Sequence, residues 1–327
     1  MTHTVVTAAR TVLFATLSLT FAAQVSASDT YPSRPIRVVV PVAAGGWGDA
    51  STRIVAQRMA EELGQPVVVE NRTGAGGLLG IRHTKAEAPD GYTLMSTGGT
   101  IAIQQALSND PGYDTLKDFT AVGSMVRSPA IVVTSAASPY KTMPELIAAA
   151  RANPQKISYG SAGVGTTTHI AAEMLLRKAG VKMMHVPYKG NGAAMPDVIA
   201  GRVSFMIDAY GSSASNIGGG RLRALGVTSD TPMNALPNVP VVASEGVPGF
   251  KYYYWLGLFA PAGVPPDVVA KLSGALKKAL SDPKIEARLQ SDGTENAFMA
   301  PAEFSTFLRK EVAETASLIN DLGLPKE

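Results

Sequence analysis

Three loops of the sequence combine small residues, hydroxyl groups and a predicted helix start. Residues 43–49, 97–100 and 161–169 each follow a predicted strand and lead into a predicted helix. A helix start presents unpaired backbone N–H groups and the positive end of the helix dipole. Glycine lets that backbone come close to a ligand, and Ser or Thr hydroxyls add further donors. The chemistry that these loops predict is the binding of an anion.

Missing motifs narrow the class of anion. No Gly-Lys pair occurs, so the chain has no P-loop. The stretch GAGGLLG at residues 74–80 approaches a dinucleotide fingerprint but has Leu79 where the third glycine is needed. With phosphate cofactors set aside, a small carboxylate is the better prediction, and we expect no cofactor.

The sequence contains few residues in the arrangements that catalysis requires. The stretch GSAG at 160–163 lacks the glycine that a nucleophile elbow places two residues before its serine, here Ser161. Beyond residue 27 the histidines are His83, His169 and His185, and none lies at metal-ligand spacing from another. The sequence has no cysteine, which excludes disulfides and thiolate metal sites. We therefore predict neither catalysis nor a metal.

Four polar residues near these loops have two interpretations each. Asp49 is either the N-cap of a helix starting at Ser51 or a residue that shapes the loop. His169 is either a neutral residue that fixes its loop or a catalytic group. Asp208, which ends a strand, is either a cap or a polar contact across a cleft. Lys189 is either a solvated turn residue or a partner for a carboxylate.

The elements that must position these residues begin after an export signal. Arg10 precedes a short apolar run at residues 11–23, and small residues follow, which is the order of a signal peptide with cleavage after Ala27. The alternative is a buried N-terminal helix. No other segment has about 18 consecutive apolar residues, so the mature protein is expected to be soluble and periplasmic. An exported chain without disulfides fits a large periplasmic domain.

Short, continuously apolar strands alternate with helices in the mature chain, which predicts α/β architecture with parallel sheets covered on both faces. The pattern runs from residue 36 to about 107 and restarts at Ile157, which implies two doubly wound lobes. Residues 125–144 and 252–261 look like two connections between the lobes. The predicted division is lobe 1 at 28–126, lobe 2 with its crossover at 127–250, and a return crossover with C-terminal helices of lobe 1 at 251–327.

Charge argues against nucleic acid as a partner. Without the leader and its Arg10, the net charge is +2, and the basic residues are scattered without aromatic interleaving. A modest positive charge is compatible with an anionic small molecule.

Trp47 is unusual among the glycines of the first loop. Its indole either packs against the facing lobe or covers a ligand, and the flat ring suits both. The second option predicts a planar or aromatic carboxylate.

A collinear series of motifs covers the mature chain from about Tyr31. The series is YPSRPIRVVVPVAAGGWGD, GQPVVVENRTGAGG, APDGYTLMSTGGT, GSAGVGTTTH, HVPYKGNGAAMPDVIAGRVSFMID, GRLRALGVTS and YWLGLFAPAGVP. It resembles the periplasmic Bug-type receptors of tripartite tricarboxylate transporters. Two departures fall in the ligand-facing loop, where the family often has Phe at the position of Val42 and Gly followed by Thr or Ser in place of Trp47-Gly48. Relatives' ligands are therefore not transferred.

The resemblance implies a two-lobed periplasmic-binding-protein fold, type II-like, with the ligand in a cleft between lobes that close like a flytrap. It implies capture of a small carboxylate through backbone donors and waters, and delivery to membrane permease subunits. The ligand-binding residues that we predict are Ala43, Ala44, Gly45, Gly46, Trp47, Asp49, Thr97, Gly98, Thr100, Ser161, Gly165, Thr166, Thr167, Thr168, His169, Lys189, Gly190 and Asp208. The alternative functions are a sensory receptor that presents its ligand to a sensor kinase and, third, a periplasmic hydrolase.

Overall fold

The computed structural model describes residues 31–324 and 326. The predicted signal peptide and its cleavage site lie outside these residues. Contacts divide the chain into residues 1–33 and residues 34–327, and the elements below belong to the second unit. Among the described helices, none has both the length and the apolar character needed to cross a bilayer.

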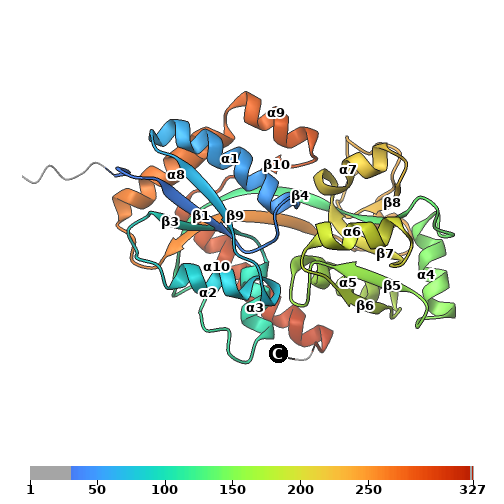
Figure 1. The fold of residues 1–327 in the computed structure, drawn as a ribbon. Helices are drawn as coiled ribbons and strands as arrows, with labels where there is room; N and C mark the ends of the chain where they lie inside the picture. The colour runs from blue at the N-terminus through green and yellow to red at the C-terminus, as the bar shows by residue number, and fades with distance from the viewer. Residues whose placement is uncertain (1–30, 325, 327) are drawn as a thin grey trace, which may run out of the picture. The chain divides into compact units, whose positions relative to one another are not determined.

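Lobe 1 is built on the strands at one end of a long curled sheet (Figure 1). The strand order there is β2-β1-β3-β9-β4, in which β1 pairs in parallel with both β2 and β3. These strands are β1 (Ile36–Val40), β2 (Val67–Asn71), β3 (Thr93–Thr97), β9 (Tyr253–Pro261) and β4 (Phe119–Ser135). The helices that belong to this lobe are α1 (Trp47–Leu63), η1 (Ala75–Gly77), α2 (Leu78–Lys85), α3 (Thr100–Leu107), α8 (Pro266–Leu280), α9 (Pro283–Ser291) and α10 (Pro301–Leu322).

Local sequence explains the central elements of lobe 1. The run IRVVV of β1 is almost entirely buried, and β-branched residues favour a strand covered on both faces. In α1 the buried residues Val55, Met59 and Leu63 recur every four positions, which gives the helix one apolar stripe. The helix ends at Gly64, whose φ of 67° is a left-handed conformation that glycine adopts without strain.

Lobe 2 uses the other end of the same sheet, in the order β4-β7-β5-β6 with β8 also paired to β4. Its strands are β5 (Ser158–Ser161), β6 (Met184–Pro187), β7 (Phe205–Ala209) and β8 (Leu222–Val227). Its helices are α4 (Met143–Ala152), α5 (Thr167–Ala179), α6 (Asn191–Ile199), α7 (Tyr210–Gly218) and η2 (Val242–Ser244). The pairs β5–β6 and β5–β7 are parallel.

Two long strands join the lobes. The first part of β4 pairs antiparallel with β9, and its last residues, Ala130 to Ser135, pair with β7 and β8 in lobe 2. The strand β9 also pairs antiparallel with β3. The sheet is therefore mixed, with its parallel strands toward the two ends and the antiparallel crossing strands between them.

The C-terminal helices cover lobe 1. Helix α10 packs its buried Phe304 and Leu308 into the same apolar cluster as Met95 and Phe259. Gly257 of β9 is necessary for this packing, because a Cβ at that position would overlap the ring of Phe304. The two-residue strand β10 (Glu295–Asn296) pairs with β4 beside the crossing.

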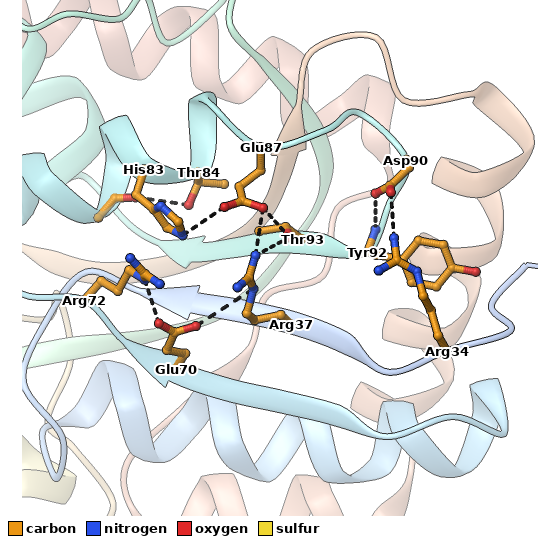
Figure 2. Close-up of polar contacts among 11 residues, drawn as sticks. Arg34, Arg37, Glu70, Arg72, His83, Thr84, Glu87, Asp90, Tyr92 and Thr93 are labelled. Atoms are coloured by element: carbon orange, nitrogen blue, oxygen red, sulfur yellow. Dashed lines mark hydrogen bonds and ion pairs between the residues drawn. The ribbon is translucent and has the colours of Figure 1, made fainter.

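Ion pairs tie the surface of lobe 1 together (Figure 2). Arg37 of β1 donates from Nη2 to Glu87 Oε2 at 2.7 Å, and its Nε lies 3.9 Å from Glu70 Oε2 of β2. Arg72 also pairs with Glu70, at 2.6 Å. These pairs are partly exposed, so each adds little to stability and together they orient the edge of the sheet.

Candidate functional site

A cavity of about 120 Å³ lies between the carboxyl ends of the strands of both lobes. A space of this size holds on the order of ten water molecules, or a small organic acid in their place. Of the residues predicted from the sequence, those that line it are Ala43, Ala44, Gly46, Trp47, Thr97, Gly98, Thr100, Thr166, Thr167, Thr168, Gly190 and Asp208.

Five helices begin at this cavity. The first residues of α1, α3, α5 and α6 line it, as do Ala209 and Ser212 at the start of α7. Four of these helices, α1, α3, α6 and α7, have no side-chain cap on their first turn. The first-turn N–H groups of a helix lack intrahelical acceptors, so these ends offer donors and positive dipole potential to the cavity. The arrangement suits an anion held by neutral groups.

Charged side chains are scarce in the lining. Asp208 is the one carboxylate, and none of the lining residues is Lys, Arg or His. Burial raises the pKa of Asp208 above its ordinary value, against hydrogen bonds that favour the charged form. These come from Asn191 Nδ2 at 2.6 Å, from Ser213 Oγ at 2.7 Å and from the backbone N–H of Ala209. Asp208 thus faces the cavity and is held by residues of its own lobe, so the structure shows it neither as the N-cap of α7 nor in a contact across the cleft.

The β5–α5 loop of lobe 2, residues 161–169, is braced by its own side chains. Thr166 is the N-cap of α5, and its Oγ1 accepts a hydrogen bond from the N–H of His169 and donates to Gly163 O at 2.7 Å. Thr168 Oγ1 accepts from the N–H of Ala162 at 2.9 Å. His169 Nδ1 accepts from the N–H of Gly165 at 3.3 Å. The loop therefore presents the start of α5 in one conformation.

The β1–α1 loop of lobe 1, residues 43–49, differs from the prediction. Helix α1 begins at Trp47 rather than Ser51, so its N-cap is Gly46, and the predicted N-cap role of Asp49 is wrong. Asp49 is buried and shapes the loop, because its carboxylate accepts hydrogen bonds from the N–H of Gly45 at 3.0 Å and from Arg53 Nε at 2.9 Å. Burial opposes the charge of Asp49, but these bonds and one from Asn71 outweigh it and lower its pKa.

Trp47 makes contacts at the junction of the lobes. Its backbone N–H donates to Ser212 Oγ of α7 at 3.0 Å, and its indole Nε1 donates to Thr294 Oγ1 at 2.8 Å. The ring lies 6.1 Å from that of Tyr254, centroid to centroid, and packs against the apolar core of lobe 2. Trp47 also lines the cavity. These contacts favour packing between the lobes, the first of its two interpretations.

Six predicted residues lie outside the lining. The N–H of Gly45 donates a hydrogen bond to the carboxylate of Asp49. Gly165 is a loop residue with a φ of +68°. Ser161 and His169 are buried behind the loop. Lys189 is exposed in a bend, as the solvated-turn interpretation has it. These positions support the cavity from behind or face solvent.

A stacked aromatic group lies behind the β5–α5 loop. The rings of His169 and His185 are 4.2 Å apart, and Tyr159 stacks on His185 at 4.8 Å. Burial lowers the pKa of both histidines to about 4, and for His169 the neighbouring His185 adds to the effect. Both are therefore neutral at pH 7, and His169 fixes its loop as a hydrogen-bond acceptor.

Ser161 and His185 form a close pair, with Ser161 Oγ 2.6 Å from His185 Nε2. A nucleophilic serine must reach its substrate, yet Ser161 is completely buried and is outside the cavity lining. Among the described residues, no three His, Cys, Asp or Glu side chains are placed to share a metal ion. The geometry gives this pair a structural role.

Sequence reasoning missed part of the lining. The missed residues are Val40, Pro41, Val42, Ser96, Asn191, Gly192, Ala209, Ser212, Tyr254, Trp255 and Leu256. Gly48 and Ala162 also line the cavity and lie in the predicted loops, although they were not among the predicted ligand-binding residues. Asn191 and Gly192 follow the Gly190 that was predicted, so their place at a helix start could have identified them. The β9 residues carry no local signal, because the strand reaches the cavity only through its pairing with β3 and β4.

Comparison with known proteins gives one family. The family model described as "Tripartite tricarboxylate transporter family receptor" matches residues 51–324. A curated relative from Pseudomonas sp. (strain P51), the UPF0065 protein in the tcbD-tcbE intergenic region, is 38% identical over 297 residues, covering 90% of this chain and 88% of its own.

Two solved structures share the fold along nearly the whole chain. The structure of periplasmic binding protein BugD has a TM-score of 0.87 and 33% identity, covering 91% of this chain and all of its own. MatC (Rpa3494) from Rhodopseudomonas palustris with bound malate has a TM-score of 0.83 and 29% identity, covering 88% of this chain and all of its own. The fold of this chain is that of two-lobed periplasmic binding proteins.

Proposed function

We propose that this chain, which belongs to the tripartite tricarboxylate transporter receptor family, captures a small carboxylate in the cavity between its lobes and delivers it to a membrane permease. The receptor acts in the periplasm and has no catalytic step. The mature chain divides as lobe 1 at residues 28–126, lobe 2 at 127–250 and a return to lobe 1 at 251–327. Strand β4, which pairs with β9 and β10 of lobe 1 and with β7 and β8 of lobe 2, supports this division.

The observation that carries the proposal is the convergence of five helix starts on a cavity without a basic side chain. Backbone N–H groups and the hydroxyls of Thr97, Thr100, Thr167 and Thr168 supply directional donors for carboxylate oxygens. A site of neutral donors holds an anion without an ion pair to a basic side chain. The absence of that ion pair favours release of the ligand, which a transport receptor requires.

Malate, the ligand in the structure of MatC, is a short aliphatic acid. An aromatic acid would have to stack on Trp47, whose N–H is used by Thr294 and whose ring packs beside Tyr254. We therefore propose a small aliphatic carboxylate as the ligand class. The preference for a planar or aromatic acid stays a prediction, because Trp47 lines the cavity and its ring is within reach of a ligand there.

The experiment is a thermal-shift screen of the mature protein against aliphatic acids such as malate and adipate and aromatic acids such as benzoate. A ligand at about 100 times its Kd should add roughly 2.7 kcal/mol to the free energy of unfolding. Calorimetry on each hit should give one site per chain. Stabilisation by no carboxylate would contradict the proposal, and turnover of a carboxylic ester would replace it with a hydrolase.

A further inference from the structure

Gln104 joins the two lobes beside the cavity without lining it. It lies on α3, one turn after Thr100, and its side chain is buried. Its Nε2 donates to Gly165 O at 3.1 Å and to Val164 O at 3.4 Å, and both acceptors belong to lobe 2. The same Nε2 lies 3.3 Å from Gly76 O in lobe 1. One amide group thus bridges backbone carbonyls of both lobes.

Two glycines make room for this amide. Gly76 and Gly165 have φ values of +61° and +68°, a region that other residues rarely adopt. A Cβ at either position would overlap Gln104 Nε2, and a Cβ at Gly76 would also overlap Val164 O. The GAGG stretch at residues 74–77, which only approaches a dinucleotide fingerprint, therefore has a different use in this chain. It lets the backbone of lobe 1 approach the β5–α5 loop.

The bridge lies directly behind the proposed anion site. Val164 and Gly165 precede Thr166–Thr168, which line the cavity from lobe 2, and Thr100 lines it from lobe 1 on the helix that carries Gln104. The internal bonds of the β5–α5 loop set its shape, but they do not set its distance from lobe 1. The contacts of Gln104 contribute to that distance, together with the apolar packing of Ile170 on α5 against Ile103 and Leu107 on α3.

We propose that Gln104 is a positioning residue that holds the start of α5 against lobe 1 when the lobes are together. The proposal rests on the proposed function, since it assigns Gln104 a role in carboxylate binding. Separation of the lobes breaks two of its three contacts, so the bridge stabilises the closed form. Loss of the bridge should speed ligand release and leave the encounter rate unchanged.

The test variants change one group at a time. Gln104→Met keeps the length of the side chain and removes the N–H donors. Gln104→Glu keeps the shape and turns a carboxylate oxygen toward the backbone carbonyls. Gln105→Met is the matched control, because Gln105 Oε1 accepts a hydrogen bond at 2.6 Å from the N–H of Thr115 within lobe 1 and makes no bridge.

The first measurement is hydrogen exchange of the protein without added ligand. In Gln104→Met we expect faster exchange at residues 163–168 and no change in the strands of lobe 2, and Gln105→Met should match wild type at 163–168. Equal exchange at these residues in wild type and Gln104→Met would overturn the positioning role, whatever any carboxylate does.

The second measurement is binding of malate and adipate by stopped flow and calorimetry. Loss of the bridge should raise the dissociation rate of a bound acid roughly 5- to 10-fold in Gln104→Met, and more in Gln104→Glu. The melting temperature without ligand should stay near that of wild type. If wild type binds neither acid, the ligand class is wrong, while the exchange result still decides the role of Gln104. Unchanged dissociation in Gln104→Met would overturn the proposal.

Discussion

The two loops that face each other across the cavity are stabilised in different ways. The β5–α5 loop is held by hydrogen bonds among its own residues, with Thr166 and Thr168 as acceptors for its backbone. The β1–α1 loop has one such bond, from Gly45 to Asp49, and its other side-chain bonds come from residues outside the loop, namely Arg53, Asn71, Ser212 and Thr294. Lobe 2 therefore presents its half of the proposed anion site in a preorganised form, whereas the half in lobe 1 is completed by contact with its surroundings. Preorganisation of one half lowers the ordering cost of binding.

Acid should disrupt the preorganised loop first. The pKa of His169 and His185 is lowered to about 4 in the folded protein, against about 6.5 in the unfolded chain. Their neutral forms therefore contribute stability that is fully present above pH 6.5 and is lost as the pH falls through 4. We expect a loss of about 3 kcal/mol in the free energy of unfolding for each of the two histidines.

Urea unfolding at several pH values between 7 and 4 measures this loss. The loss of stability at acid pH should be smaller in His185→Gln than in wild type. It should be unchanged in His83→Gln, a variant in lobe 1. An identical pH dependence in wild type and His185→Gln would show that the stacked pair does not carry the effect.

Filling the loop of lobe 1 should block binding while leaving the fold intact. Gly46 has a φ of −80°, and a Cβ there would find its nearest neighbour, Ala43 O, at 4.0 Å. Gly46→Val is therefore tolerated by the backbone and places its methyls in the cavity. We expect carboxylate binding to weaken by about 1–3 kcal/mol, roughly 5- to 150-fold, measured by calorimetry.

The control for this variant is Ala50→Val, on an exposed position of the same helix. It should bind as wild type does. Equal affinity of Gly46→Val and wild type would mean that the anion is not held at this loop.

The cap of α5 should matter for binding as well as for stability. Thr166→Val keeps the shape of the side chain but leaves the N–H of His169 without its acceptor, at a cost of about 1 kcal/mol in the free energy of unfolding. Thr142→Val removes the N-cap of α4 in the same lobe, away from the cavity. We expect destabilisation from both variants in thermal unfolding, larger for Thr166→Val because it also loses the bond to Gly163 O, and weaker carboxylate binding only for Thr166→Val. Weaker binding from both would point to a general effect of stability.

The smallest effect is expected at Trp47. Trp47→Phe keeps an aromatic ring beside Tyr254 and removes the hydrogen bond to Thr294. The loss of one hydrogen bond predicts a change of about 0.5–1.5 kcal/mol in binding free energy. If Trp47 joins the lobes, malate and benzoate should be affected alike in competition calorimetry. A selective loss for benzoate would instead support stacking on the ligand.

The sequence predicted the elements with a strong local signal. The continuous apolar run of β1 and the threonine-rich start of α5 indicated a strand end and a helix start, and both border the cavity. The start of α1 was predicted four residues too late, because Trp47 and Gly48 have weak helix propensity and a contact with Ser212 outweighs it.

Other parts of the site have no local pattern to find. Helix α7, with the sequence YGSSASNIG, has too few apolar residues for a helical period, so Ser212 was not predicted. Tyr254 and Trp255 reach the cavity because β9 crosses between β3 and β4. That placement depends on contacts between residues more than 100 positions apart, which periodicity does not report.

The absence of basic side chains from the lining has a consequence for how such a receptor changes over generations. A point mutation that replaces a lysine removes a charged ligand contact at once, but every residue except proline carries a backbone N–H. Under the proposed function, side-chain substitutions around this cavity change its shape, and with it the acid that fits, while the backbone donors themselves remain.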